Sequence, residues 1–319
     1  MTTNQKINPR KAAMIGCGFV GSACVFSLMQ SGLFSEIVLI DADERRAEGE
    51  ALDISHGVPF ARPMKIYAGN YDDIGDASVI IITAGANQKP GETRLELVSK
   101  NISIFKNIIP QISSRNFGGI LLIVTNPVDV MTYAAIKIGN FQEERVIGSG
   151  TVLDTARLKY SLGELLGVDS RSVHAFIIGE HGDSEIAAWK SANISGIEID
   201  DFCTMRCYKD HHAEMEQIAE EVKNSAYEII ERKKATYYGI AMAVRRICEA
   251  IVRDEKSILP ISSMMYGEYD IEDVVLSMPA ILGKDGVETK VPIDLSNNEL
   301  LNLKKSADTL KEVLHENGF

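Results

Sequence analysis

The sequence has 319 residues, 45% of them hydrophobic and 24% charged, which is typical of a soluble globular protein with a sizeable buried core. Its formal net charge of −12 argues against a nucleic-acid or membrane-surface partner, because both require a basic face. The five cysteines, an odd number in a long chain, predict free thiols, and neither a secretory signal nor a membrane span is visible. We therefore expect a cytoplasmic protein.

The first half of the chain alternates short β-branched segments with helical ones. The predicted strands are Lys11–Ile15, Ile37–Asp41, Met64–Ala68, Val79–Thr83, Ile120–Thr125 and Arg145–Gly148. Helical segments such as Phe19–Ser31 and Leu95–Arg115 lie between several of these strands. This alternation predicts βαβ units and a doubly wound parallel sheet over residues 1–150.

The pattern changes after Gly150. The predicted elements there are a helix at Leu153–Leu166, an extended stretch at Val173–Ile178, helices at Ala213–Lys233 and Gly239–Ile251, strand-like segments with turns at Gly267 and Lys284–Gly286, and a helix from about Ser296. Strands that are grouped apart from helices predict an α+β second domain over residues 151–319, packed closely on the first.

A glycine-rich turn, GCGFVG at residues 16–21, joins the first strand to the first helix. Gly16 permits the tight turn, Gly18 lets a pyrophosphate approach the backbone, and Gly21 lets helix and strand pack closely. Asp41 ends the second strand, where its carboxylate can accept both ribose hydroxyls and would repel the 2′-phosphate of NADP. A glycine turn that merely packs a helix on a sheet is the alternative. Strand, glycines, helix and acid in register favour a Rossmann domain that binds NAD.

His181 lies in a turn, GEHGDS at residues 179–184, beyond an apolar strand. A lone histidine is more often structural, but its ordinary pKa near neutrality suits it to donate and accept a proton at cellular pH. Asp154 and Arg157 are three residues apart and share one helix face, which on its own is also the pattern of a weak surface ion pair.

Two loops at strand ends add polar residues to this group. The loop at residues 85–94 contains glycine and proline, carries Arg94 at the start of the next helix, and could close over a cofactor. Asn126 follows the fifth strand, at the edge where α/β sheets bind ligands, and Asn126–Pro127 is a candidate cis peptide.

Together these motifs resemble the L-lactate dehydrogenase family, and the match runs over nearly the whole chain. The matching segments, in family order and spacing, are GCGFVG, VLID, AGANQKPGETRLELV, VTNPVDV, GSGTVLDTAR, IIGEHGDSE and ATYYGIAM. The wider family also contains malate dehydrogenases, so the substrate needs a separate argument. The implied reaction interconverts pyruvate and (S)-lactate and would regenerate NAD in fermentative glycolysis.

The resemblance also implies roles for the candidate residues. His181 would protonate the pyruvate oxygen as NADH delivers hydride to C2, and Asp154 would accept a hydrogen bond from the other ring nitrogen. Arg157 would bind the substrate carboxylate bidentately, and Arg94 would polarise the carbonyl when its loop closes.

Further contacts follow from the same resemblance. Asn126 would assist at the carbonyl, Thr236 would border the methyl pocket, and Ile240 would cover the nicotinamide ring, with Ser149 nearby. The expected cofactor contacts are Gly16, Gly18, Val20, Gly21, Asp41, Arg46, Tyr71, Gly85, Ala86, Asn126, Ser149 and Ile240.

Gln88 separates lactate from malate as the substrate. Oxaloacetate carries a second carboxylate, which a water-excluding site must neutralise, and malate-type relatives have an arginine at this loop position. The neutral amide of Gln88 offers no countercharge and so favours pyruvate, while we expect the neighbouring Lys89 to point into solvent. A non-catalytic NAD-binding module is the third alternative, but such a module needs neither an acid–base pair nor two arginines.

Bacterial members of this family are often tetramers that fructose 1,6-bisphosphate activates through an arginine and a histidine. This sequence has His174 but carries Lys159 where the arginine is usual, so activation and inertness are equally expected. We expect a homotetramer and no metal, since the order of Cys203, Cys207, His211 and His212 fits no common zinc spacing.

Overall fold

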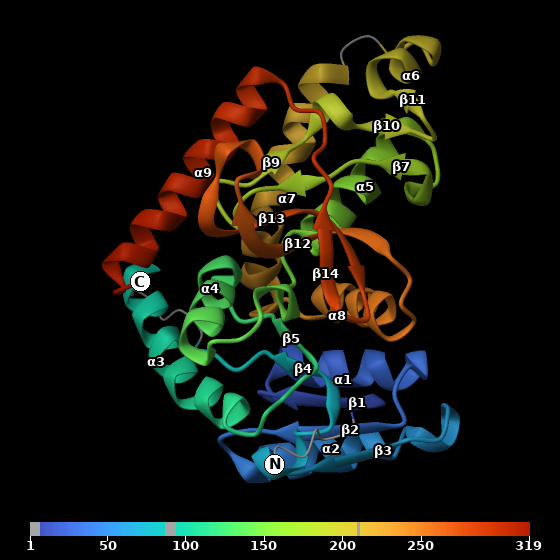
Figure 1. The fold of residues 1–319 in the computed structure, drawn as a ribbon. Coiled ribbons are helices and arrows are strands. Elements are labelled where there is room, and N and C mark those ends of the chain that lie inside the picture. The colour runs from blue at the N-terminus through green and yellow to red at the C-terminus, as the bar shows by residue number, and fades with distance from the viewer. Residues whose placement is uncertain (1–6, 87–93, 209–210) are drawn as a thin grey trace.

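The computed structural model describes residues 7–86, 94–208 and 211–319, with the backbone alone for Arg94. The strands predicted in the first half all form, as β1 (Asn8–Ile15), β2 (Glu36–Ile40), β3 (Lys65–Ala68), β4 (Ala77–Ile82), β5 (Ile120–Ile123) and β6 (Val146–Gly148). They are parallel, in the order β6-β5-β4-β1-β2-β3 (Figure 1). This order reverses between β1 and β4, which confirms the doubly wound sheet and places a ligand crevice at the carboxyl ends of those strands.

Helices on both faces of this sheet follow from the alternation of side chains along the strands. The helices of the first half are α1 (Phe19–Ser31), α2 (Glu44–Ser55), α3 (Arg94–Ser113) and α4 (Val128–Gly139). In β1, Ala13 and Ile15 belong to a core formed with α3 and α4, whereas Ala12 and Met14 belong to a core formed with α1 and α2. Because successive strand residues point to opposite faces, an apolar run of this length requires cover on both sides.

The second half contains both helices and strands, as predicted. Its elements are α5 (Val152–Leu166), β7 (Val173–His174), β8 (Ile177–Ile178), β9 (Ile186–Ala187), β10 (Asn193–Ile194), β11 (Ile197–Glu198), α6 (Ile199–Met205), α7 (His211–Lys233), α8 (Tyr238–Val252), β12 (Ser257–Tyr266), β13 (Glu272–Gly283), β14 (Gly286–Lys290) and α9 (Asn297–Glu316). The predicted extended stretch at 173–178 is divided, because β7 pairs with β10 whereas β8 pairs with β9.

The three long strands of the second half continue the sheet of the first half. Strands β12, β13 and β14 are antiparallel neighbours, and β12 meets β6 where Ser262 pairs with Gly148. Within the described residues this produces one nine-stranded mixed sheet, which runs through both halves (Figure 1). The sequence pattern did not indicate this junction.

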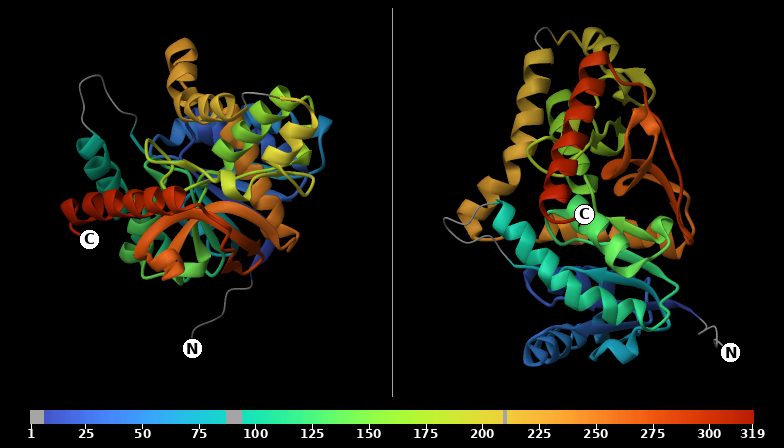
Figure 2. Two further views of the ribbon diagram at one scale, coloured as in Figure 1. Left: turned by 90° about the horizontal axis from the view of Figure 1, so that it is seen from above. Right: turned by 60° about the vertical axis from the view of Figure 1, so that its left-hand side comes forward.

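Two helices of the second half also pack on the first half. Helix α8 shares a core with α1, and the ring of Tyr237, just before α8, stacks on Phe19 at a centroid distance of 5.6 Å. Helix α9 runs along one side of the molecule, so that the C-terminal end of the chain lies beside α3 and α4 (Figure 2). There Ser99 Oγ donates to Asn317 Oδ1 over 2.7 Å.

The cysteines are free, as their odd number predicted. Cys207 is exposed, and the buried thiols are those of Cys17, Cys24, Cys203 and Cys248. Burial raises the pKa of Cys17 and of Cys24 to about 12. In the described part of the chain, no helix combines the length and the apolar character that a membrane span needs.

Candidate active site

His181 and Asp154 form the centre of the site. Asp154 lies in the first turn of α5, and His181 follows β8 in the turn that leads to β9. The Nδ1 atom of His181 is 2.6 Å from Asp154 Oδ2, and the two side chains are 25% and 3% exposed. With Nδ1 occupied by the carboxylate, the ring presents Nε2 as the atom that can meet a substrate.

Arg157 shares the same carboxylate. Its Nη1 donates to Asp154 Oδ1 over 2.9 Å, one helical turn along α5. Asp154 thus holds an imidazole with one oxygen and a guanidinium with the other. The remaining N–H groups of Arg157 can grip an incoming carboxylate, for which the planar fork is well matched.

Electrostatics set the charge of this group. Burial disfavours the imidazolium, but the charge of Asp154 and its hydrogen bond outweigh burial and raise the pKa of His181 to about 9. Burial likewise opposes ionisation of Asp154, yet His181 and Arg157 hold the pKa of this carboxyl below its usual value. At neutral pH the ring therefore carries a proton that it can donate.

Asp129 holds the backbone of the catalytic turn. Its Oδ2 accepts from the His181 amide over 2.8 Å, and its Oδ1 accepts from the hydroxyls of Ser262 and Ser277 over 2.5 and 3.3 Å. Burial raises the pKa of Asp129, while these hydrogen bonds oppose the shift. Sequence reasoning treated Asp129 only as part of a motif; the available signal was a carboxylate within an otherwise apolar first turn of a helix.

The chain's last helix supports the other side of this turn. Ser306, in α9, accepts the Glu180 amide over 2.9 Å, and its Oγ lies 2.8 Å from Ser184 Oγ. Ser184 in turn donates to Glu180 Oε2 over 2.5 Å. The turn that carries His181 is therefore fixed by contacts from α4, α5 and α9, which come from three separate parts of the chain.

The glycine turn fits a dinucleotide. Gly16 has a φ of 99°, and a Cβ there would lie 2.5 Å from Ala84 N, while a Cβ at Gly21 would lie 1.9 Å from Gly16 O. A Cβ at Gly18 would meet no described atom within 4 Å, so open space faces the N-terminus of α1. Asp41 accepts the Cys17 amide over 2.6 Å, which holds the acid beside the turn. A pyrophosphate fits that space, and a ribose fits beside Asp41.

Asn101 joins the loops that follow β4 and β5, and sequence reasoning missed it. Its Oδ1 accepts the Ala86 amide and its Nδ2 donates to the Asn126 carbonyl, both over 2.8 Å. Asn126 is exposed at the carboxyl end of β5, and the Asn126–Pro127 peptide, a candidate from the sequence, is cis. A buried polar residue on the apolar side of α3 was the signal that could have indicated this role.

The remaining predicted contacts are spread over several elements. Ser149 is buried after β6, while Thr236 precedes α8 and Ile240 lies within it, both half-buried. The others are Val20 (half-buried, α1), Arg46 (exposed, α2), Tyr71 (half-buried, before β4) and Gly85 (exposed, after β4).

Some predicted residues cannot be placed. Gln88 and Lys89 lie outside the described residues, as does the side chain of Arg94, whose backbone begins α3. Lys159 is half-buried on α5 and His174 is exposed on β7; burial lowers the pKa of Lys159.

Comparisons with known proteins agree with this geometry. Residues 10–148 match the NAD binding domain of lactate/malate dehydrogenase, and residues 151–318 match the alpha/beta C-terminal domain of that family. The L-lactate dehydrogenase of Acetivibrio thermocellus is 52% identical and covers 98% of this chain and 98% of its own length. L-lactate dehydrogenase 1 of Clostridium acetobutylicum is 51% identical and covers 95% of this chain and 97% of its own.

Solved structures show the same likeness. A lactate dehydrogenase from a Medee basin deep-sea metagenome library has a TM-score of 0.93 and 46% identity, over 97% of this chain and 99% of that one. The minor L-lactate dehydrogenase of Enterococcus mundtii has a TM-score of 0.92 and 40% identity, over 96% of this chain and 98% of its own. With both family models matched, full-length relatives at about 50% identity and an acid–base pair beside an arginine, the chain belongs to the lactate/malate dehydrogenase family.

Proposed function

We propose that this chain is an NAD-dependent L-lactate dehydrogenase, which interconverts pyruvate and (S)-lactate. The observation that carries the proposal is the 2.6 Å contact between His181 Nδ1 and Asp154 Oδ2, with Arg157 on the same carboxylate. Full-length relatives at about 50% identity carry the name L-lactate dehydrogenase. We also propose that residues 1–150 bind the cofactor and residues 151–319 form the substrate domain.

The mechanism follows from the charges of the site. Arg157 binds the pyruvate carboxylate, and His181 Nε2 donates its proton to the keto oxygen as that oxygen gains charge. Asp154 stabilises the imidazolium before the transfer and keeps the ring oriented after it. When bound, NADH supplies the hydride that C2 of pyruvate receives. In the reverse direction neutral His181 takes the proton from the lactate hydroxyl.

The proposed substrate and cofactor contacts also include four further residues, Arg94, Asn126, Thr236 and Ser149. Arg94 polarises the carbonyl from the loop side, Asn126 assists it, and Thr236 borders the substrate methyl group. Ser149 and Ile240 contact the nicotinamide end of the cofactor.

Substrate choice depends on Gln88 in this proposal. Gln88→Arg adds a cation that pairs with the second carboxylate of oxaloacetate, so the ratio of kcat/KM for oxaloacetate to that for pyruvate should rise by about 10² or more. The measurement is the loss of NADH absorbance with each keto acid. Lys89→Arg is the matched control and should leave the ratio within about threefold. A wild-type preference for oxaloacetate would favour malate dehydrogenase, and no turnover of either acid would favour a binding module.

Assembly and regulation form a further part of the proposal. We propose a homotetramer in which Lys159 and His174 offer a weak site for fructose 1,6-bisphosphate, because α5 contacts β7 and both side chains are cationic or protonatable. Adding the sugar bisphosphate at subsaturating pyruvate should lower the apparent KM, and Lys159→Met should abolish the response. An unchanged KM in the wild type would remove this effector from the proposal.

A further inference from the structure

Glu185 lies four residues beyond His181, at the end of the catalytic turn and just before β9. The carboxylates of Glu185 and Asp154 and a ring nitrogen of His181 lie within 4.8 Å of one another. Glu185 Oε1 is buried and has no hydrogen-bond partner among the described residues. A buried carboxylate with an unpartnered oxygen is costly when it is charged, so this position requires an explanation.

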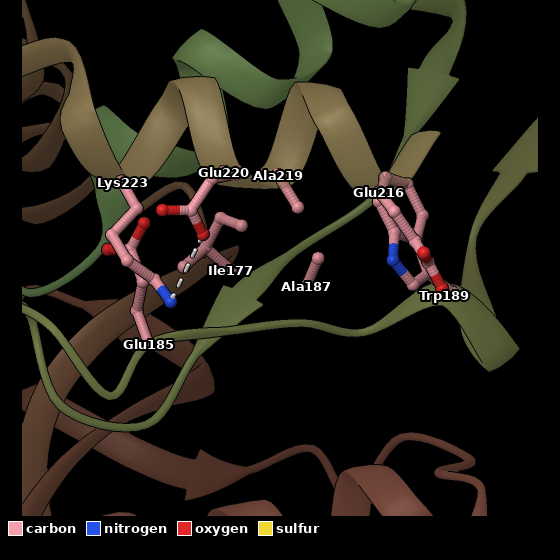
Figure 3. Close-up of a pocket in the computed structure, with 8 residues that line it drawn as sticks. All are labelled: Ile177, Glu185, Ala187, Trp189, Glu216, Ala219, Glu220 and Lys223. Carbon is pink, nitrogen blue, oxygen red and sulfur yellow. Dashed lines mark ion pairs between the residues drawn. The ribbon is translucent and has the colours of Figure 1, made fainter. Parts of the chain in front are cut away.

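Glu185 also lines a cavity of about 130 Å³ beneath α7. Its lining residues are Ile177, Glu185, Ala187, Trp189, Glu216, Ala219, Glu220 and Lys223. Figure 3 shows Glu185, Glu220 and Lys223 at one end of the cavity and Glu216 against Trp189 at the other. Lys223 Nζ is 3.8 Å from Glu220 Oε2, so Glu220 already shares the positive charge closest to Glu185 in the cavity.

The surrounding charges oppose ionisation of Glu185. Burial, and then the negative charge of Asp154, raise the pKa of Glu185 above its usual value, against smaller opposing effects of His181, Lys223 and Arg157. The pKa of Glu185 is raised to about 8 and that of His181 to about 9, so the two groups lose their protons over neighbouring ranges of pH. The charge of each group shifts the pKa of the other, so the two protons are lost in linked steps.

Charge balance shows which form accepts a substrate. With a substrate carboxylate bound, the negative charges of that carboxylate, of Asp154 and of Asp129 equal the positive charges of Arg157, protonated His181 and the proposed Arg94. An ionised Glu185 adds one unmatched negative charge to a buried site. A protonated Glu185 adds none.

We propose that Glu185 is a positioning residue of this site, and that it must carry a proton, together with His181, when the substrate carboxylate binds. The inference rests on the proposed reduction of pyruvate. It implies that binding requires two protons on the protein, whereas the chemical step consumes only the proton of His181.

The test is the pH dependence of kcat/KM for pyruvate. On a logarithmic plot, the wild type should fall in two steps toward about a hundredfold per pH unit, the signature of two lost protons. Glu185→Gln stays neutral at every pH, so this variant should fall in one step, toward about tenfold per pH unit. Glu216→Gln is the matched control, because it makes the same change at the far end of the cavity, and it should keep both steps.

A second variant, Lys223→Met, tests the same inference if Glu185→Gln does not fold. Lys223→Met removes a charge that stabilises ionised Glu185, so the first step should move to higher pH while the second keeps its position. A one-step fall in the wild type, or two steps in Glu185→Gln, would overturn the inference and leave the proposed function intact. Absence of pyruvate turnover in the wild type would instead overturn the proposed function.

Discussion

Asp154 is the residue on which the proposed hydride and proton transfer depends most. One of its oxygens holds His181 and the other holds Arg157, so the proton donor and the substrate grip are aligned by a single side chain. Its buried charge also keeps the imidazole protonated at neutral pH. The orientation of the His181 ring and its protonation thus both depend on the carboxylate of Asp154.

This shared role predicts a pH effect with a definite sign. Pyruvate reduction needs protonated His181, so the step in kcat/KM that belongs to this ring should come as pH rises through about 9, above the step assigned to Glu185, while lactate oxidation should increase as His181 loses its proton. Asp154→Asn removes the charge that raises this pKa, so the loss should move to lower pH, and turnover should fall by roughly 10²–10⁴-fold. Asp169→Asn, an exposed carboxylate paired with Arg171, is the control. An unshifted profile in Asp154→Asn would contradict the assignment.

The sequence predicted the reacting residues but not the residues that hold them. His181, Asp154 and Arg157 each lie in a local motif whose residue types suit the chemistry. Asp129 and Ser306 act through contacts that span 52 and 126 residues, to His181 and Glu180. Because such contacts depend on how distant segments pack, no local spacing in a single sequence can indicate them.

At the scale of elements, the two glycines Gly18 and Gly21 in the turn between β1 and α1 have different surroundings. Gly21→Ala should lower the melting temperature by several degrees, because the added Cβ would overlap the Gly16 carbonyl oxygen. Gly18→Ala has room for its Cβ in the protein, so it should fold normally and bind NADH about tenfold or more weakly. Thermal melts and NADH fluorescence titrations measure these effects.

The control for the glycine series lies in α2. A Cβ at Gly49 would have no described atom within 4 Å. Because Gly49→Ala replaces a flexible residue inside a helix, this variant should be about 0.5–1 kcal/mol more stable and should bind NADH as the wild type does. Equal loss of NADH affinity in Gly18→Ala and Gly49→Ala would show that the space at Gly18 is not the phosphate site.

The elements themselves were largely predictable. A short apolar run rich in β-branched residues, such as Val79–Thr83, is typical of a buried strand of a parallel sheet, and the structure forms β4 there, at Ala77–Ile82. The pairing of β12 with β6 was not predictable, because it joins strands more than a hundred residues apart through one backbone pair, Ser262 with Gly148.

At the scale of the whole molecule, the pairing of β12 with β6 joins the two halves into one continuous sheet. Neither β6 nor β12 is an edge strand at this point, and α8 and α9 also pack the second half on the first. Two halves that share a sheet should unfold together, as a single cooperative transition.

Urea denaturation tests this cooperativity. Trp189, the single tryptophan, reports on the second half, and far-UV circular dichroism reports on the whole chain. Their midpoints should coincide. Gly148→Val places side-chain atoms against Thr132 and Ser262, where even a Cβ would approach within 2.6 and 2.7 Å, so it should lower the common midpoint. Separate midpoints in the wild type would contradict a shared sheet.

The distribution of thiols has a practical consequence for such measurements. Burial shields Cys17, Cys24, Cys203 and Cys248 from reagents and suppresses their reactive thiolate form, which leaves Cys207 as the accessible thiol of the native fold. A maleimide dye should therefore attach to the unmodified protein at one position per chain, with no engineered handle, and mass spectrometry would count the attachments. Single-molecule work on this enzyme can begin with its native sequence.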